Sequence, residues 1–430
     1  MKIAYVTSRY PAISHTFVLR EVEALRAQGL EIATFSIRRT GGNQLLSAAD
    51  KAEHATTYAI LPVRPLDLIA AHVGGFLRHP LAYLGTLLFS LRQHTPGIKG
   101  VVWQGFYFLE AIILWHQCKK RGIGHIHAHF ANVAADAALL AATFGERAKS
   151  GPRTWSFTMH GPTEFFNVDA FKLPVKARLA TFIACISDYC RSQLLAFTSD
   201  AVKLQIVHCG IDTDLFAAVD RRRTPTQILS VGRLVPEKGH AVLIEALALL
   251  HERGLPARLT LVGDGPERAR LEAQAQRLQI DRYVTFAGSV GQDHIRQHYA
   301  AADVFCLPSF AEGVPVVLME AMATGLPVVS SRIMGIPELI EENRSGLLTR
   351  PGRSDLLASA LQRLLVNPHL RERLGAAGRN KVIAEFTSAA NAARLAEMFR
   401  SLPTVHASAS QVSAAKVDAA AVPVAAGAST

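Results

Sequence analysis

The sequence predicts an α/β protein with two doubly wound domains, each a parallel sheet covered by helices. Short apolar segments typical of strands alternate with segments of helical periodicity from residue 2 onward. The alternation stops near residue 220 and begins again at Gln227. With 430 residues and 49% hydrophobic residues, the chain can fill two sizeable cores.

The first half opens with a β-α-β unit. We expect a strand over 2–8, a helix with apolar residues at 17, 18, 22 and 25, and a second strand over 31–37. Gly29 ends the helix between them. Further strands of this domain are expected at 125–129, 154–158, 181–185 and 203–208.

The stretch 66–117 reads as helices broken at Pro80 and Pro96. Ordinary packing against the first sheet is the simpler interpretation. A membrane-surface role is the alternative, because aromatic, aliphatic and cationic side chains are mixed there. The residues that suggest it are Phe76, Leu77, Arg78, His79, Tyr83, Leu87, Phe89 and Arg92.

The second half repeats the alternation after a charged linker at 220–226. Its strands are expected at 227–231, 258–262, 284–286, 304–307 and 327–330, and its last helices at 355–365 and 381–399. These elements predict a first domain over 1–219, a second over 227–380, and a final helix over 381–400. From 401 to 430 the chain is rich in Ala, Ser and Val and lacks aromatics, which predicts a disordered tail.

Composition narrows the class of partner. The formal net charge is +11, but the cations are spread along the chain, so we expect no nucleic-acid binding. The five cysteines include no CxxC pair, which favours buried thiols over disulfides. No apolar stretch reads as a signal peptide or a spanning helix, so we expect a cytoplasmic protein that does not cross a membrane.

The segment from Glu312 to Val328 carries the strongest chemical signal. A glycine-led loop precedes a short helix, so the amides of Gly313, Val314, Val316 and Val317 should lie at a helix N-terminus that favours an anion such as a diphosphate. The two carboxylates, Glu312 in the loop and Glu320 on the helix, suit the binding of sugar hydroxyls. The structural alternative is a solvated glutamate and a capping glutamate.

A second basic segment follows the first strand of the second domain. Arg233 and Lys238 should lie at the carboxyl edge of the sheet, where doubly wound folds bind ligands. Two cations there can neutralise a leaving diphosphate without a metal ion. We therefore expect neither a metal nor a cofactor at this site. Simple surface charge is the alternative.

Together these segments resemble the retaining glycosyltransferases of family 4, which have the GT-B fold of two Rossmann-like domains facing across a cleft. The resemblance covers residues 1 to about 400 and includes Leu261-Val-Gly-Asp-Gly-Pro266 and His208-Cys-Gly-Ile-Asp212. The first half is similar to the exopolysaccharide branch of colanic-acid and amylovoran enzymes. Its matching runs are Tyr10-Pro-Ala-Ile-Ser14, Thr16-Phe17, Arg20-Glu21, His127-Ala-His129-Phe130 and Ser156-Phe-Thr158-Met-His160-Gly161.

The resemblance implies a role for each candidate residue. Arg233 and Lys238 would hold the diphosphate, Glu320 the ribose and Glu312 the transferred sugar. Ser289 and Val290 would contact the base, and His160 would reach from the first domain to the donor sugar. His125, His127 and His129 share a strand face, but three alternate residues of one strand seldom bind zinc, so we expect no metal there.

The resemblance thus implies a retaining hexosyltransferase that uses a nucleoside-diphosphate sugar, with uracil as the expected base. Its acceptor would be a glycan or a lipid-linked oligosaccharide, and peripheral membrane association would fit such an acceptor. The final helix should cross back to the first domain. Two alternatives share the fold: an epimerase or phosphorylase, and a non-catalytic scaffold that binds nucleotide sugars.

Overall fold

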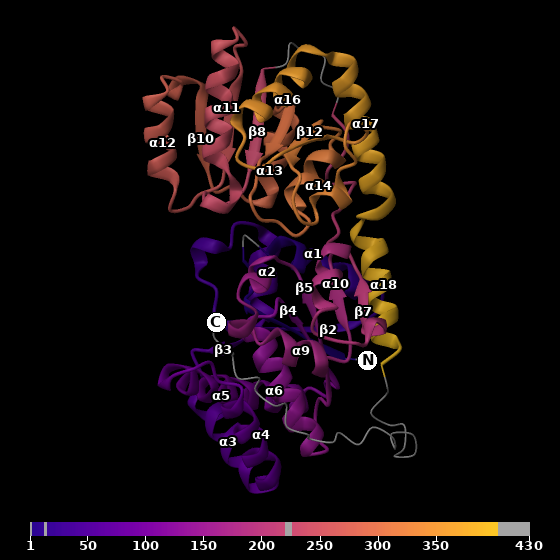
Figure 1. The fold of residues 1–430 in the computed structure, drawn as a ribbon. Coiled ribbons are helices and arrows are strands. Elements are labelled where there is room, and N and C mark those ends of the chain that lie inside the picture. Colours follow the sequence, from indigo (N-terminus) through magenta and orange to yellow (C-terminus); the bar gives the residue numbers. More distant parts are fainter. Residues whose placement is uncertain (1, 13–14, 220–225, 403–430) are drawn as a thin grey trace, which may run out of the picture.

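A computed structural model of the chain describes residues 2–12, 15–219 and 226–402 (Figure 1). Two parallel sheets, each flanked by helices, form the two domains. The expected linker at 220–226 and the tail from 401 lie almost entirely outside the described residues.

The first sheet has seven strands in the order β3-β2-β1-β4-β5-β6-β7. The expected strands are present, and β3 is an addition that the sequence did not predict. The strands are β1 Lys2–Arg9, β2 Glu31–Arg38, β3 Tyr58–Leu61, β4 His125–His129, β5 Thr154–Met159, β6 Ile183–Cys185 and β7 Leu204–Ile206. The helices include α1 Thr16–Ala27, α2 Ala48–Thr56, α3 Pro65–Arg78, α4 Pro80–Arg92, α5 Ile98–Lys120, α6 Val133–Arg147, α9 Leu173–Leu179 and α10 Asp188–Leu194.

The second sheet has six strands in the order β10-β9-β8-β11-β12-β13. They are β8 Gln227–Val231, β9 Arg258–Val262, β10 Val284–Gly288, β11 Val304–Leu307, β12 Val328–Ser331 and β13 Leu347–Thr349. The main helices are α11 His240–Glu252, α12 Arg268–Arg277, α13 Gln292–Ala301, α14 Val316–Ala323, α15 Ile336–Leu339 and α16 Ser354–Val366. Strand order reverses between β8 and β11, so a crevice for a ligand is expected at their carboxyl ends.

The C-terminal helical segment differs from its prediction. A single helix from Lys381 is wrong: α17 spans Pro368–Glu385 and α18 spans Ser388–Arg400. Asn367 caps α17 and Thr387 caps α18, so two N-terminal caps define two helices. The expected return to the first domain does occur, because α17 packs on α14 and α18 packs on α1.

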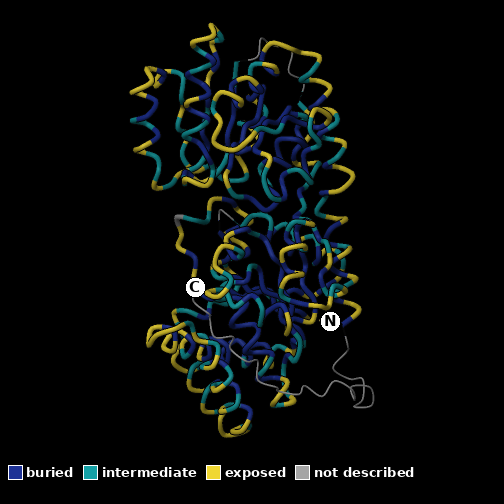
Figure 2. Tube along the Cα trace, in the orientation of Figure 1, coloured by how far each residue is buried: buried dark blue, intermediate teal, exposed yellow. Residues whose placement is uncertain are grey.

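The two domains share buried apolar contacts. One cluster of core side chains includes Phe157 and Ile186 of the first domain and also Val314 and Leu318 of the second. The burial-coloured trace shows the dark interior of both sheets (Figure 2). Among the described helices, α5 is the one long and apolar enough to cross a membrane, but half of its apolar stretch is buried. A core helix has the same properties.

Candidate active site at the domain interface

Lys238 and Glu312 meet at the crevice between β8 and β11. Lys238 ends a short 3-10 helix after β8, and its Nζ lies 2.6 Å from Oε1 of Glu312, in the loop after β11. The Ser309 hydroxyl donates to the same oxygen at 2.7 Å. An ammonium has three donors, so Lys238 can keep this bond and still bind a phosphate oxygen.

Gly239 brings these two loops together. Its φ is +69°, and a Cβ there would lie 2.0 Å from the carbonyl oxygen of Pro308. Only glycine combines the left-handed conformation with so close an approach to another backbone. The pairing of Lys238 with Glu312 therefore depends on the glycine that follows the lysine.

The N-terminus of α14 continues the same crevice. Within the described chain, the amides of Gly313, Val314, Val316 and Val317 donate to no backbone carbonyl or side chain. Unpaired amides at a helix N-terminus attract anions. The crevice thus combines the partly buried ammonium of Lys238 with several unpaired backbone donors.

Glu320 is buried further along α14 and is held by both domains. Its Oε1 accepts from Nη2 of Arg20 at 2.7 Å, and its Oε2 accepts from the Tyr299 hydroxyl at 2.8 Å. Arg20 belongs to α1 of the first domain, also donates to Gln292, and lies over the ring of Phe216. Burial and the neighbouring Glu320 carboxylate raise the pKa of Tyr299, so its hydroxyl stays protonated and donates.

Three further contacts hold the domains together beside this crevice. A Cβ on Gly313 would lie 2.3 Å from the carbonyl oxygen of His160, so the Gly313 loop packs directly on the first domain. The Glu338 carboxylate accepts from the amides of Asp188 at 2.7 Å and Tyr189 at 2.8 Å, at the N-terminus of α10. A Cβ on Gly291 would lie 3.0 Å from that of Leu46.

The His160 side chain is directed into the first domain. Its Nε2 lies 2.8 Å from Nδ1 of His129, and its Nδ1 lies 3.5 Å from Sγ of Cys209. Burial, followed by the charges of His129 and His15, lowers the pKa of His160 well below its usual value, so the ring is neutral. A bond from this ring to a donor sugar, which the resemblance implies, requires one of these two contacts to break.

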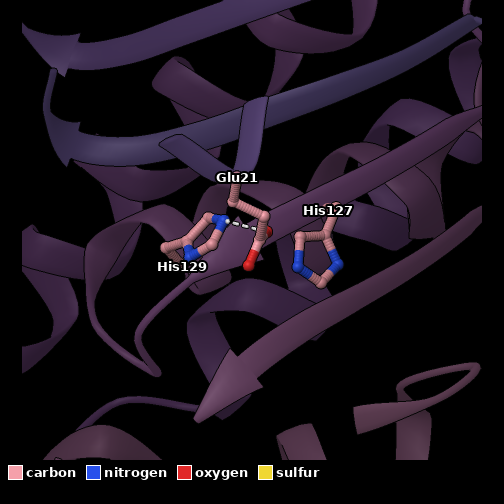
Figure 3. A group of neighbouring side chains, drawn as sticks. All are labelled: Glu21, His127 and His129. Atoms are coloured by element: carbon pink, nitrogen blue, oxygen red, sulfur yellow. Dashed lines mark ion pairs between the residues drawn. The ribbon is translucent and has the colours of Figure 1, made fainter. Parts of the chain in front are cut away.

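Two histidines of β4, His125 and His127, form hydrogen bonds with hydroxyls of β5. His127 reaches Ser156 at 2.7 Å and Thr158 at 2.9 Å, so both of its nitrogens have partners. His129 Nε2 lies 3.4 Å from Oε1 of Glu21 (Figure 3), and Glu21 also accepts from Tyr5. The contact between His129 and Glu21 lacks hydrogen-bond geometry, so the buried Nε2 of His129 has no hydrogen-bond partner among the described residues.

Glu21, His127 and His129 are also the one group of three metal-type ligands found among the described residues. Their ligand atoms lie within 4.8 Å of one another. A cation there would compete with the two hydroxyls on His127 and with Tyr5 on Glu21. His129 Nε2, by contrast, has no hydrogen-bond partner within the described part of the chain.

The remaining predicted residues lie at the same sheet edge. Arg233 follows β8, is exposed, and makes no side-chain hydrogen bond within the described residues. Ser289 and Val290 follow β10; Ser289 is exposed and Val290 is half-buried. The structure therefore places Arg233, Lys238, Glu312 and the α14 amides around one crevice, with Ser289 and Val290 at the end of the outer strand β10.

Sequence reasoning missed four residues of this interface. Arg20 lies in one of the runs that carry the resemblance but was assigned no role, and Ser309, Tyr299 and Glu338 were assigned none either. A signal existed for Arg20, since it sits in the Arg20-Glu21 pair of the opening helix. Nothing in the local sequence of Tyr299 or Glu338 indicates a partner in another element.

Comparison with known proteins identifies the second half. Residues 212–381 match the family of glycosyl transferases group 1. This part of the chain is a group 1 glycosyltransferase domain. It contains Arg233, Lys238, Glu312, Glu320 and the amides of α14, so the crevice described above belongs to the glycosyltransferase domain.

Relatives in exopolysaccharide assembly extend the similarity into the first domain. A putative colanic acid biosynthesis glycosyltransferase, WcaL of Escherichia coli K12, is 29% identical over 84% of this chain and 90% of its own. The amylovoran biosynthesis glycosyltransferase AmsK of Erwinia amylovora is 37% identical over 50% of this chain and 55% of its own. A GDP-mannose-dependent phosphatidylinositol monomannoside mannosyltransferase of Mycobacterium tuberculosis is 33% identical, and the match spans 61% of its length.

Solved structures show that the whole chain has the GT-B fold. HepE of Anabaena, crystallised with UDP and glucose, superposes with a TM-score of 0.71 at 19% identity, over 94% of this chain and 100% of that one. Sucrose-phosphate synthase of Thermosynechococcus elongatus gives 0.69 at 22% identity, over 93% and 98%. Two α/β domains therefore face each other, as the GT-B fold requires.

Proposed function

We propose that the protein is a retaining hexosyltransferase of family 4 that uses a UDP-sugar donor in exopolysaccharide biosynthesis. Its acceptor is a hydroxyl of a glycan or lipid-linked oligosaccharide. The observation that carries the proposal is the juxtaposition of the Lys238 ammonium with Glu312 and the unpaired α14 amides. The naming of WcaL and AmsK, and the UDP bound to HepE, support it.

In this mechanism the bond between the sugar anomeric carbon and the β-phosphate oxygen breaks. The acceptor oxygen bonds to the same face of that carbon, and its proton passes to the departing phosphate oxygen. Negative charge grows on the diphosphate, where Lys238, Arg233 and the amides at the N-terminus of α14 stabilise it. One well-placed donor of this kind commonly lowers the activation free energy by about 3 to 4 kcal/mol.

The two carboxylates have separate tasks. Glu312, oriented by Lys238 and Ser309, lies beside the phosphate-binding donors and accepts from hydroxyls of the transferred sugar. Glu320 retains acceptor capacity beyond Arg20 and Tyr299, because an ionised carboxylate offers about four lone-pair sites. That capacity suits the ribose hydroxyls. Ser289 and Val290 lie after β10, where the base would bind.

A screen of UDP- and GDP-sugars tests the proposal. We expect UDP to bind in calorimetry, and one UDP-sugar to release UDP when a lipid extract is added, with no loss of activity in EDTA. A non-catalytic scaffold would bind UDP but would not release UDP from any UDP-sugar. An epimerase would act on its nucleotide sugar without the lipid extract. The mannosyltransferase relative makes GDP-mannose the second donor to test. Binding of neither nucleotide would overturn the proposal.

A further inference from the structure

Three consecutive helices of the first domain carry their large apolar side chains on the outside. More than half of the exposed large apolar residues that the structure describes lie on α3, α4 and the first half of α5. We call them the apolar surface: Leu66, Ile69, Val73, Phe76, Leu77, Leu81, Leu84, Leu88, Ile98, Val101, Val102, Trp103, Phe106 and Leu109. Scattered single apolar residues are normal on a protein surface, whereas a set of this size marks an interaction site.

Helix α4 shows the pattern most clearly. Its buried residues are Ala82, Thr86 and Ser90, which are small or carry a hydroxyl. Its opposite face presents Leu81 at 86% exposure, and it also exposes Leu84 and Leu88. A helix packed on the core of a protein in water has the reverse arrangement. Ordinary packing of this stretch, the simpler interpretation, therefore holds for the small residues and for Tyr83, Leu87 and Phe89, which pack on the core. It does not hold for the three exposed leucines.

Helix α3 also buries small residues and exposes large apolar ones, and the first half of α5 does so in part. In α3 the buried residues are Ala71 and Gly75, while Leu77 is 73% exposed. In the first half of α5 the buried residues are Gly100, Gln104 and Phe108. The backbone oxygen of Gln104 accepts from Ser90 at 2.9 Å. Trp103, next to Gln104, is 41% exposed. Hydrogen bonds and ring contacts such as that of Tyr83 with Phe108 join the three helices, and the residues of the apolar surface remain exposed.

The charges around the apolar surface have one sign. Every exposed Lys, Arg, Asp or Glu between 62 and 109 is a cation, namely Arg64, Arg78, Arg92 or Lys99. The acidic residues of this stretch are turned inward. Asp67 binds Tyr58 and Gln117, and Glu110 is buried.

We propose that the apolar surface docks on a bilayer containing anionic lipid, with α3, α4 and the start of α5 lying in the interface. Apolar side chains would enter the lipid boundary, Trp103 would lie at headgroup depth, and the cations would meet the lipid phosphates. A second copy fits less well, because a two-fold contact would bring each positively charged rim against its equal.

The position of the surface in the molecule suits this role. Helices α3, α4 and α5 lie at the end of the first domain remote from the second domain (Figure 1). Docking there leaves the Lys238 crevice and the second domain in water. The inference goes beyond the donor chemistry proposed above and does not rest on it.

Vesicle flotation with the full chain tests the docking. We expect strong binding to vesicles of phosphatidylcholine with phosphatidylglycerol, and much weaker binding to phosphatidylcholine alone. Replacing three cations (Arg78→Gln, Arg92→Gln, Lys99→Gln) should weaken binding to the anionic vesicles by about fivefold per cation. Replacing three leucines (Leu81→Gln, Leu84→Gln, Leu88→Gln) should weaken it at least about tenfold, since apolar burial drives interfacial binding.

The matched control replaces exposed apolar residues elsewhere: Val202→Gln, Leu278→Gln and Val366→Gln. It should bind vesicles as the wild type does, and all variants should keep the wild-type circular dichroism and UDP affinity. Failure of the wild type to float with anionic vesicles would overturn the inference. So would a wild-type dimer that the three leucine changes convert to monomer without vesicle binding. Vesicle binding without sugar transfer would sink the proposed function alone.

Discussion

Arg20 and Glu320, 300 residues apart in sequence, form a 2.7 Å ion pair across the two domains. Their side chains are only 10% and 3% exposed. The cost of removing these two charges from water is offset only while they remain paired. The position of α1 in the first domain therefore decides whether the buried Glu320 carboxylate of the glycosyltransferase domain keeps its cation.

Arg20→Ala should lower the free energy of unfolding by about 3 kcal/mol or more, because it leaves Glu320 buried without its cation. We also expect weaker UDP binding, since an unpaired buried carboxylate tends to take up a proton and lose acceptor capacity. Chemical denaturation and calorimetry measure the two effects. Adding Glu320→Gln removes the uncompensated charge. The double variant should therefore lose less free energy of unfolding than the two single variants lose together. Strict additivity would contradict the pairing.

Lys238→Ala should slow sugar transfer on the order of a hundredfold or more, because the leaving diphosphate loses the partly buried cation that stabilises its charge. Turnover of the donor that wins the nucleotide-sugar screen provides the measurement. Lys51→Ala is the matched control, since Lys51 is an exposed lysine of α2. Unchanged turnover in the Lys238 variant would remove this residue from the mechanism.

Gly313→Ala should separate the domains. Its Cβ would lie 2.3 Å from the carbonyl oxygen of His160, so one of the two loops must move. Overpacking of this kind typically costs about 1 to 3 kcal/mol. We expect a lower melting temperature and a larger radius of gyration in solution scattering. Gly42→Ala is the control, because a Cβ there meets nothing within 4 Å; equal behaviour of the two variants would refute the contact.

Stability should fall as the pH drops below about 6.5. Burial lowers the pKa of His125 to about 3 and lowers those of His127 and His160 well below the usual value. The unfolded chain then binds more protons than the folded one, so stability is lost as pH falls below the unfolded pKa. Three such groups give at most roughly 4 kcal/mol per pH unit. Denaturation at pH 7 and pH 5 measures the loss, and His125→Asn should reduce it.

Periodicity predicted most of the fold, and the exceptions have local causes. The strands over 227–231 and 258–262 were confirmed at both ends. The strand over 58–61 was missed because an edge strand of four residues is too short to show alternation. The strand over 347–349 was missed for the same reason. The C-terminal helices were misplaced because Pro368 was not recognised as the first residue of a helix.

Topology predicted which residues gather at the crevice but not how they pair. Lys238 and Glu312 follow β8 and β11, and adjacent parallel strands bring their carboxyl ends together. Arg20, which pairs with Glu320, and the amides that bind Glu338 come from the other domain, and no local pattern contains that information. The direction of the His160 ring depends on His129 and Cys209, which lie on different elements.

The chain passes between the domains twice, and the two passages are bonded to each other. The amide of Ile211 donates to Phe386, and that of Ser388 donates to Ile211, both at 2.9 Å. The two segments that connect the domains are therefore hydrogen-bonded to each other side by side. A rotation of one domain about this pairing would keep both hydrogen bonds intact.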